Sequence, residues 1–217
     1  MSIPSVLHIG TAAALTAGAA LGPPFGSPAA SADPCADVEV VFARGTNEPA
    51  GPGYIGQAFA GSLGAQLPGR SLAVYAVNYP ASTDYLTSSA AGSDDASAHV
   101  ENLVAACPNT RIVLGGYSQG AAVTELSTAA MPPSVADHVA AVALFGRPSS
   151  AYSASLVDGA ALPTITAPYA SKTIDLCLPE DPVCSSGANM MAHVSYIPAG
   201  LANQAATFAA ERITLTP

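Results

Sequence analysis

The stretch RIVLGGYSQGAAVTEL, residues 111–126, places a serine where an apolar strand pattern changes into a helix pattern rich in small residues. Ser118 is flanked by Gly116 and Gly120, and G-x-S-x-G between a strand and a helix is the nucleophile-elbow pattern. In such a turn the glycines remove side chains that would block a strained corner, and the serine hydroxyl is exposed above the edge of the sheet. Serines also often serve as helix N-caps, which is the structural alternative for Ser118.

Short apolar runs alternate with longer amphipathic segments along the chain, which is typical of strands joined by crossover helices. We predict strands over Val38–Phe42, Leu72–Asn78, Arg111–Tyr117, Val139–Phe145 and Ser171–Leu176, and helices over Gly53–Leu67, Asp94–Ala106, a segment from Ser118 onward, and Leu201–Arg212. Residues 147–168 predict a loop region. The predicted fold is α/β: a three-layer αβα sandwich, compact and α/β-hydrolase-like, around a central parallel sheet of about five strands, with no large lid.

Within that pattern, Asp94 and Asp95 are expected in the first turn of their helix, where the helix dipole favours negative charge.

The first 32 residues have the features of a secretory signal peptide. Val6–Leu21 is an apolar run rich in alanine, and the small-residue sequence Ala30-Ser31-Ala32 follows it. A retained membrane anchor is the alternative, although the run is short for a bilayer span and is interrupted by glycines. Removal of this leader would leave residues 33–217 as a single catalytic domain with no transmembrane span, secreted and either released or held at the cell wall.

The formal net charge is −9, and the sequence contains only six Lys and Arg residues. Neutralisation of phosphates needs clustered cations, so nucleic acid is not an expected partner. With 10% charged and 50% hydrophobic residues, the composition suits a compact secreted enzyme. We expect a monomer.

Four cysteines permit three disulfide pairings. Cys177 and Cys184 bracket the short loop LPEDPV, which favours a local bridge and leaves Cys35 to pair with Cys107 at the end of a predicted helix. Four free thiols would suit a reducing compartment, which fits poorly with a signal peptide. No C-x-x-C or H-E-x-x-H spacing occurs, so we expect no metal site.

A serine becomes a strong nucleophile when a base takes its proton and a carboxylate orients that base. Of the four histidines, only His193 lies late in the chain, in a predicted loop between the last strand and the last helix. His138 is expected at the end of the sheet opposite the elbow. A purely structural histidine is the alternative for His193.

Several carboxylates follow Ser118, but Asp175 falls inside a predicted strand and Asp158 in an ill-defined loop. Asp181 lies between Cys177 and Cys184. A clamped loop suits a residue that holds an imidazole in one orientation and tautomer. The alternative is that Asp181 is a solvated turn charge.

A tetrahedral oxyanion needs two hydrogen-bond donors. The backbone N–H of Gln119, directly after the serine, is one donor in an elbow of this kind. The polar turn ARGTNE after the first predicted strand offers the N–H or hydroxyl of Thr46 as the second, although such a turn is also ordinary loop structure.

Together, FARGTNE, GYSQG, CLPEDPVC and AHVSY resemble the cutinase family, including actinobacterial cutinase-like serine esterases, over residues 33 to about 212. The resemblance implies Ser118 as nucleophile, His193 as base, Asp181 as its orienting carboxylate, and an oxyanion hole of Thr46 and Gln119. It also implies the bridges Cys35–Cys107 and Cys177–Cys184. Fungal cutinases typically have serine where this chain has Thr46.

The resemblance further implies apolar loops beside the serine, at 79–86 and 185–191. Tyr85, Leu86, Met190 and Met191 are candidates for a substrate groove, with simple packing as the alternative for the two methionines. The implied function is a secreted carboxylic ester hydrolase without a cofactor, acting on short- to medium-chain, lipid-like or polymeric esters. An acyltransferase using the same triad and a non-catalytic secreted binding or antigenic protein are the alternatives.

Overall fold

The computed structural model describes residues 35–215, so the predicted signal peptide lies outside the described residues. Five parallel strands form one sheet in the order β2-β1-β3-β4-β5. The strands are β1 (Val38–Ala43), β2 (Leu72–Ala76), β3 (Arg111–Tyr117), β4 (Val139–Phe145) and β5 (Thr173–Leu176). Strand β3 lies at the centre, and all of its residues after Arg111 are buried.

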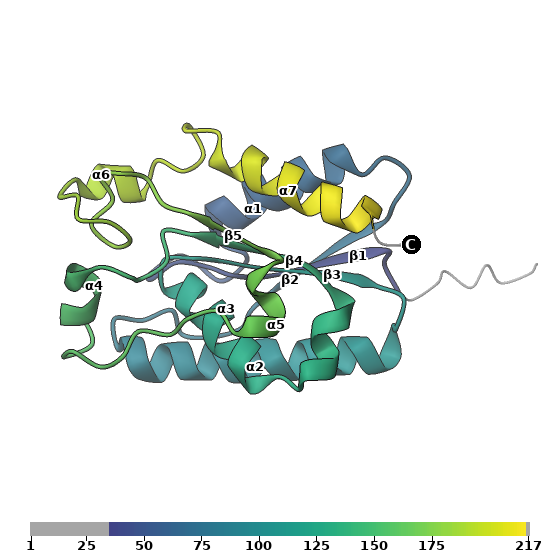
Figure 1. Cartoon of the computed structure of the whole chain (residues 1–217), viewed down its shortest axis with the longest axis horizontal. Helices are drawn as coiled ribbons and strands as arrows, with labels where there is room; N and C mark the ends of the chain where they lie inside the picture. Colours follow the sequence, from purple (N-terminus) through teal and green to yellow (C-terminus); the bar gives the residue numbers. More distant parts are fainter. Residues whose placement is uncertain (1–34, 216–217) are drawn as a thin grey trace, which may run out of the picture. The chain divides into compact units, whose positions relative to one another are not determined.

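Helices cover both faces of the sheet (Figure 1). Helices α1 and α7 pack on one face, and α2, α3 and α5 on the other, whereas α4 and α6 lie near the carboxyl ends of the strands. The bounds are α1 (Gly53–Gln66), α2 (Tyr85–Ala106), α3 (Gln119–Ala130), the 3-10 helix η1 (Pro133–His138), α4 (Ala151–Ser155), α5 (Ala167–Ala170), α6 (Met190–His193) and α7 (Leu201–Leu215). This is the predicted three-layer αβα fold.

The sheet separates two apolar layers. Under α1 and α7, the rings of Phe42, Phe59 and Phe145 pack together with centroids about 6 Å apart. On the other face, Leu114 of β3 and Val123 of α3 are buried in the second apolar layer. Within residues 35–215, no helix is both long and apolar enough to cross a membrane.

Helix α2 differs most from its prediction, because it begins at Tyr85 and not at Asp94. Asp94 and Asp95 therefore lie in its middle, and their expected place in the first turn is wrong. The first turns are rich in serine and alanine, which gives no apolar periodicity to detect. Asp95 has another role, since its carboxylate accepts hydrogen bonds from the Asn78 N–H at 2.8 Å and the Tyr75 hydroxyl at 3.0 Å.

The segment 147–168 also differs from its prediction, because it contains α4 and the start of α5. Both are single turns, too short for a periodic pattern. The Ser150 hydroxyl caps α4 by accepting a hydrogen bond from the Ser153 N–H at 3.1 Å.

Candidate active site

Ser118 lies at a sharp corner between β3 and α3. Its φ of 55° and ψ of −121° are in a region that residues other than glycine rarely adopt. A Cβ on Gly116 would lie 2.0 Å from the Gly120 carbonyl oxygen, and a Cβ on Gly120 would lie 2.0 Å from the Ala43 carbonyl oxygen. Only glycine fits at these two positions, which explains the G-x-S-x-G pattern sterically.

The imidazole of His193 meets the carboxylate of Asp181, with 2.7 Å between Nδ1 and Oδ2. His193 lies at the end of α6 and not in a loop as expected. Asp181 is fully buried. Two further donors bind its carboxylate: the Tyr196 hydroxyl at 2.6 Å and the Val183 N–H at 2.8 Å.

These contacts fix the charge and the tautomer of the pair. Burial raises the pKa of Asp181, but the hydrogen bonds from His193, Tyr196 and Val183 outweigh it and hold the pKa below its ordinary value. An ionised carboxylate accepts hydrogen bonds only, so Nδ1 of His193 carries the proton. Nε2 is then the basic nitrogen, as a general base requires.

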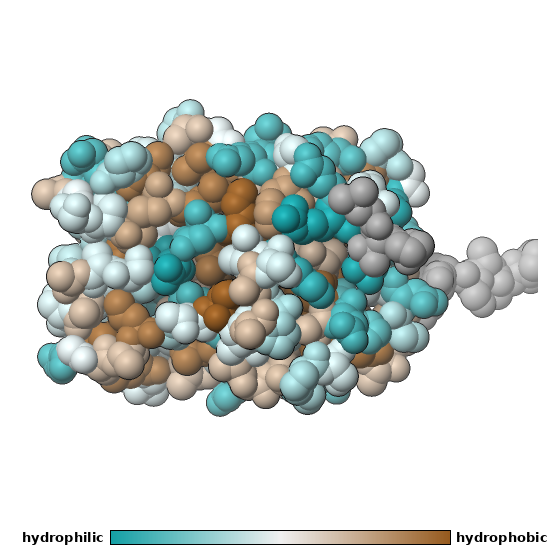
Figure 2. Space-filling model, viewed as in Figure 1, coloured by the Kyte–Doolittle hydropathy of each residue, from teal (hydrophilic) through white to brown (hydrophobic). Residues whose placement is uncertain are grey.

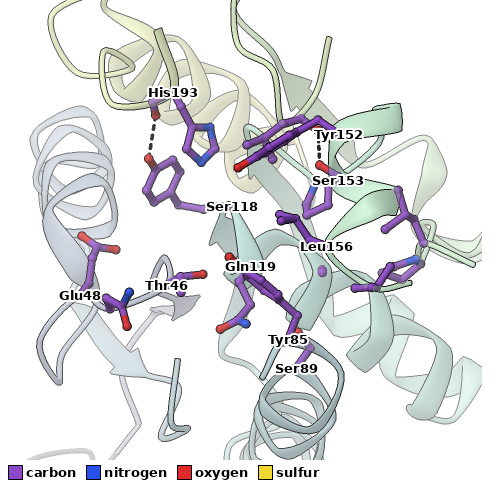
Figure 3. A pocket seen from close by; sticks show the side chains of 18 of the residues that line it. Thr46, Glu48, Tyr85, Ser89, Ser118, Gln119, Tyr152, Ser153, Leu156 and His193 are labelled. Atoms are coloured by element: carbon purple, nitrogen blue, oxygen red, sulfur yellow. Dashed lines mark hydrogen bonds between the residues drawn. The ribbon is translucent and has the colours of Figure 1, made fainter. Parts of the chain in front are cut away.

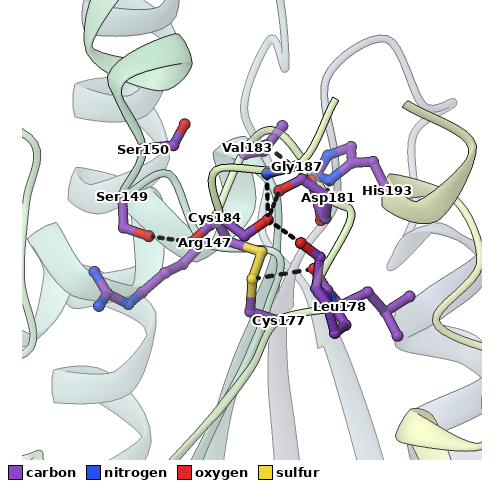
Figure 4. The surroundings of a disulfide bond; sticks show 12 residues. Arg147, Ser149, Ser150, Cys177, Leu178, Asp181, Val183, Cys184, Gly187 and His193 are labelled. Atoms are coloured by element: carbon purple, nitrogen blue, oxygen red, sulfur yellow. Dashed lines mark hydrogen bonds and ion pairs between the residues drawn. A yellow bond between two sulfur atoms is a disulfide. The ribbon is translucent and has the colours of Figure 1, made fainter. Parts of the chain in front are cut away.

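A disulfide clamps the loop that carries Asp181 (Figure 4). Cys177 and Cys184 are bonded, and Cys184 Sγ lies 3.5 Å from the Tyr196 hydroxyl. The Ser185 hydroxyl donates to the Asp181 carbonyl at 2.7 Å. The second bridge joins Cys35 to Cys107, so both pairings implied by the sequence are present.

Thr46 and Gln119 lie where β1 and β3 end, as expected for neighbouring parallel strands. Gln119 is the first residue of α3, so its backbone N–H has no acceptor within the helix. The Oγ1 atom of Thr46 is buried and has no hydrogen-bond partner in the described part of the chain. Buried hydroxyl groups are nearly always hydrogen-bonded in folded proteins, so an unpaired one needs an explanation. A substrate oxyanion bound during catalysis would supply the missing hydrogen-bond partner.

Glu48 holds the turn that contains Thr46. Its two carboxylate oxygens accept from the Gly45 N–H at 2.6 Å and the Tyr54 N–H at 3.0 Å. The Arg44 guanidinium donates to the Glu48 carbonyl at 2.9 Å, which closes the turn from the other side.

A cavity of about 560 Å³ opens over Ser118, and His193, Thr46 and Gln119 also line it (Figure 3). Of the predicted groove residues, Tyr85, Leu86 and Met190 line this cavity. Met191 does not, and its side chain is 68% exposed, so its predicted groove role has no support from the geometry.

Two ion pairs lie outside the cavity lining. His99 pairs with Glu39, and Asp175 pairs with Arg147 at 2.5 Å. Among residues 35–215, no group of three or more His, Cys, Asp or Glu side chains is placed to hold a metal ion.

Sequence reasoning missed two tyrosines and one segment that help to form the site. Tyr117 and Tyr196 contact His193 and Asp181, and both lie in quoted motifs, next to Ser118 and three residues after His193. Residues 148–163 line a large part of the cavity. Their apolar side chains are scattered among Ser, Pro and Ala, which hides the pattern.

A parallel sheet of this order, with a strained serine at the corner after its central strand, is the framework of α/β-hydrolase-like enzymes. The chain is a carboxylic ester hydrolase of this class. The family model described as Cutinase matches residues 34–213, and the chain belongs to the cutinase family.

Similar proteins and solved structures support the same family. The chain is 64% identical over 190 residues to Carboxylesterase Culp1 of Mycobacterium tuberculosis, and the match covers 88% of this chain and 88% of the relative. It is 48% identical over 212 residues to Phospholipase Culp4 of the same species, covering 93% of this chain and 89% of the relative. Trichoderma reesei cutinase in complex with a C11Y4 phosphonate inhibitor matches with a TM-score of 0.69 and 33% identity, over 83% of this chain and 78% of that chain.

Proposed function

We propose that this esterase uses Ser118, His193 and Asp181 as a catalytic triad. The observation that carries the proposal is the buried hydrogen bond between Asp181 and Nδ1 of His193, in a site whose cavity Ser118 also lines. His193 accepts the Ser118 proton as Oγ attacks the ester carbonyl, and the proton then passes to the leaving alcohol as the acyl–oxygen bond breaks. A water molecule deprotonated by His193 then attacks the acyl-enzyme and releases the acid.

In this proposal the backbone N–H of Gln119 and the hydroxyl of Thr46 stabilise the oxyanion. The Gln119 side chain is held aside, since its Nε2 donates to the Ser82 carbonyl at 2.8 Å and its Oε1 accepts from the Ser88 hydroxyl at 3.3 Å. The side chain therefore stays clear of the oxyanion and leaves its own backbone N–H for that role.

The substrates we propose are short- to medium-chain carboxylic esters, including lipid-like and polymeric ones. The mouth of the cavity supports this, because large apolar side chains such as Leu86 and Met190 are exposed there.

We also propose export from the cell with residues 1–32 removed, which two disulfides support. N-terminal sequencing of the exported protein should then begin at Asp33.

A fluorophosphonate probe tests the triad. It should label the wild type covalently and fail to label Ser118→Ala, whereas Ser62→Ala in α1 should be labelled normally. Circular dichroism checks that the variants fold. Labelling of folded Ser118→Ala would contradict the proposal.

A second experiment distinguishes hydrolysis from acyl transfer. With an alcohol added, a hydrolase yields free acid alone, whereas an acyltransferase yields a new ester.

A further inference from the structure

A second cavity lies at the end of the sheet opposite to Ser118. Its volume of about 380 Å³ is within the range of about 300–1,000 Å³ that is typical of ligand pockets. Arg111 lines this cavity as the first residue of β3, whereas Ser118 follows the last residue of the same strand, about 20 Å away. In Figure 1, α4 and α6 lie at one end of the sheet and α7 ends at the other. The second cavity is therefore separate from the candidate active site.

Positively charged side chains gather around this cavity. Arg111, Lys172 and Arg212 line it, although the whole sequence has only six Lys and Arg residues and a net charge of −9. Among the residues that the structure describes, Asp137 is the one acidic residue in the lining. Figure 2 shows hydrophilic residues on the surface around the carboxyl end of α7, whereas hydrophobic residues gather near α4. The cavity is therefore a region of positive charge on an acidic protein.

Two of the three cations are held in place by the surrounding chain. The Lys172 ammonium donates to the Ala136 carbonyl at 2.6 Å and to the Val139 carbonyl at 3.1 Å. An ammonium group has three N–H donors, so these two bonds leave one donor for a ligand. Arg212, in the last turn of α7, donates to the Phe208 carbonyl at 3.2 Å, and its guanidinium carbon lies 3.3 Å from the centre of the Phe208 ring. Both side chains are thus positioned before any ligand binds.

The Arg111 guanidinium has fewer partners than its five N–H groups require. Its Nη1 donates to the Asp137 carbonyl over a long distance of 3.5 Å, and its Nε is buried with no hydrogen-bond partner in the described part of the chain. Arg111 and Lys172 also form no ion pair within residues 35–215. Buried donors are nearly always paired, because an unpaired donor has lost its hydration without replacement. A bound anion would supply acceptors to this guanidinium group.

The cations also repel one another. Burial lowers the pKa of Arg111, and the positive charge of Arg70 lowers it further. Burial also lowers the pKa of Lys172, and Asp137 opposes this shift whereas Arg111 adds to it. An anion in the cavity would offset the repulsion, because a nearby opposite charge favours the charged form of each cation.

We propose that this cavity binds the phosphate group of a small soluble molecule, with Arg111, Lys172 and Arg212 donating hydrogen bonds to the phosphate oxygens. Guanidinium groups match the geometry of phosphate oxygens and bind them through charge-assisted hydrogen bonds. The site is independent of the proposed triad, because it lies at the other end of the sheet.

The charges of the lining favour phosphate over a carboxylate. Three positive charges face the single negative charge of Asp137, so a group with more than one negative charge is the best match. A phosphate monoester has nearly two negative charges at neutral pH, whereas a carboxylate has one. The excess of acidic residues over the whole protein would repel a polyanion such as a strongly anionic membrane, which favours a small ligand.

Isothermal titration calorimetry with glycerol 3-phosphate, at neutral pH and physiological ionic strength, tests the site. The wild type should bind one molecule saturably, and Arg111→Gln should weaken binding by about tenfold or more. The matched control is Arg70→Gln, which removes the same charge from an exposed neighbour outside the lining and should change the affinity by less than about twofold. Equal losses in the two variants would overturn the site in favour of general electrostatic attraction.

Asp137→Asn is a second variant that does not depend on a loss of binding. Asp137 is exposed, and the substitution keeps the backbone carbonyl that Arg111 contacts while it removes the negative charge from the lining. The affinity for glycerol 3-phosphate should rise by about two- to fivefold, which a misfolded protein would not show. No binding to either the wild type or Asp137→Asn would overturn the proposal. Acetate that binds as tightly as glycerol 3-phosphate would overturn the preference for phosphate.

Two further measurements complete the test. Circular dichroism and the rate of p-nitrophenyl butyrate hydrolysis should be the same in the wild type and in the three variants, because the cavity is remote from Ser118. In sedimentation with phosphatidylcholine vesicles that contain phosphatidic acid, the protein should stay in the supernatant. Retention on these vesicles that is lost in Arg111→Gln would overturn the assignment to a small soluble molecule.

Discussion

The hydroxyl of Tyr117 donates a hydrogen bond to the backbone carbonyl of His193 at 2.7 Å, and its ring lies against the imidazole with centroids 4.9 Å apart. Tyr117 directly precedes Ser118. The contact therefore joins the elbow to α6, two parts of the chain that are 76 residues apart in sequence.

Tyr117→Phe keeps the ring and removes the hydrogen bond. We expect kcat to fall about tenfold, since a buried carbonyl left unpaired costs about 1–3 kcal/mol and frees His193 to shift. KM for a short ester should change little. Steady-state kinetics measures this, and Tyr75→Phe, which removes a hydroxyl bonded to Asp95 away from the cavity, is the control. Equal effects of both variants on kcat would exclude a positioning role for Tyr117.

Thr46→Val removes the buried hydroxyl that has no partner in the described structure. If this hydroxyl binds the oxyanion, kcat should fall by about 10²–10³. The free energy of unfolding should not decrease, because an unpaired polar group is lost and its shape is kept. Thr46→Ser should restore most of the rate. Kinetics together with urea denaturation separates the two effects, and an unchanged kcat would remove Thr46 from the oxyanion hole.

Gly120→Ala should destabilise the protein by several kcal/mol or prevent folding, because the new Cβ would lie 2.0 Å from the Ala43 carbonyl oxygen. Gly64→Ala is the matched variant. It lies in an exposed part of α1 with nothing within 4 Å of the added Cβ, and should stabilise by about 0.5–1 kcal/mol. Thermal unfolding compares them. Equal stability would show that the close approach of α3 to β1 can relax.

Removal of the short disulfide, in Cys177→Ser with Cys184→Ser, should lower stability by about 2.5 kcal/mol. Activity should fall further than the unfolded fraction explains, because this loop carries Asp181 and its Val183 carbonyl accepts a hydrogen bond from Ser153, which lines the cavity. The measurement is kcat at a temperature where circular dichroism shows the variant folded. Full activity of the folded variant would show that the clamp contributes to stability alone.

The buried carboxyl of Glu125 should make the free energy of unfolding depend on pH. It is 1% exposed on α3, and burial raises its pKa to about 8, although Arg147 lies 3.6 Å away and opposes the shift. The folded protein therefore keeps a proton that the unfolded chain releases, and stability falls as pH rises from the ordinary range of a carboxyl towards 8. Denaturant titrations of wild type and Glu125→Gln should show this decline in the wild type alone. If stability changed with pH equally in both proteins, the pH dependence would come from groups other than Glu125.

The sheet could be predicted in some detail because its strands are continuous apolar runs, and the elbow because its glycines are a steric necessity. The prediction of the site rests on a related principle, because parallel strands bring the segments after β1, β3 and β5 to one edge of the sheet. Periodicity failed where side chains are small, as in the first turns of α2, and where an element is one turn long, as in α4 and α6.

Contacts between residues that are distant in the sequence were harder to predict. Asp181 could be selected from its disulfide loop, but the bond from Tyr196 to its carboxylate depends on how the chain turns after α6. Likewise, Leu126 reads as an ordinary helix residue until 148–163 is seen to leave space above it.

The close approach of Gly120 to Ala43 has a consequence for how such enzymes diverge. The backbone just after Ser118 and the backbone just before Thr46 are in direct contact, with no side chain between them. A shift of one would therefore force a shift of the other. The cavity entrance has no such constraint. We therefore expect relatives of this chain to differ more in the residues that line the entrance than at Gly120 and Ala43.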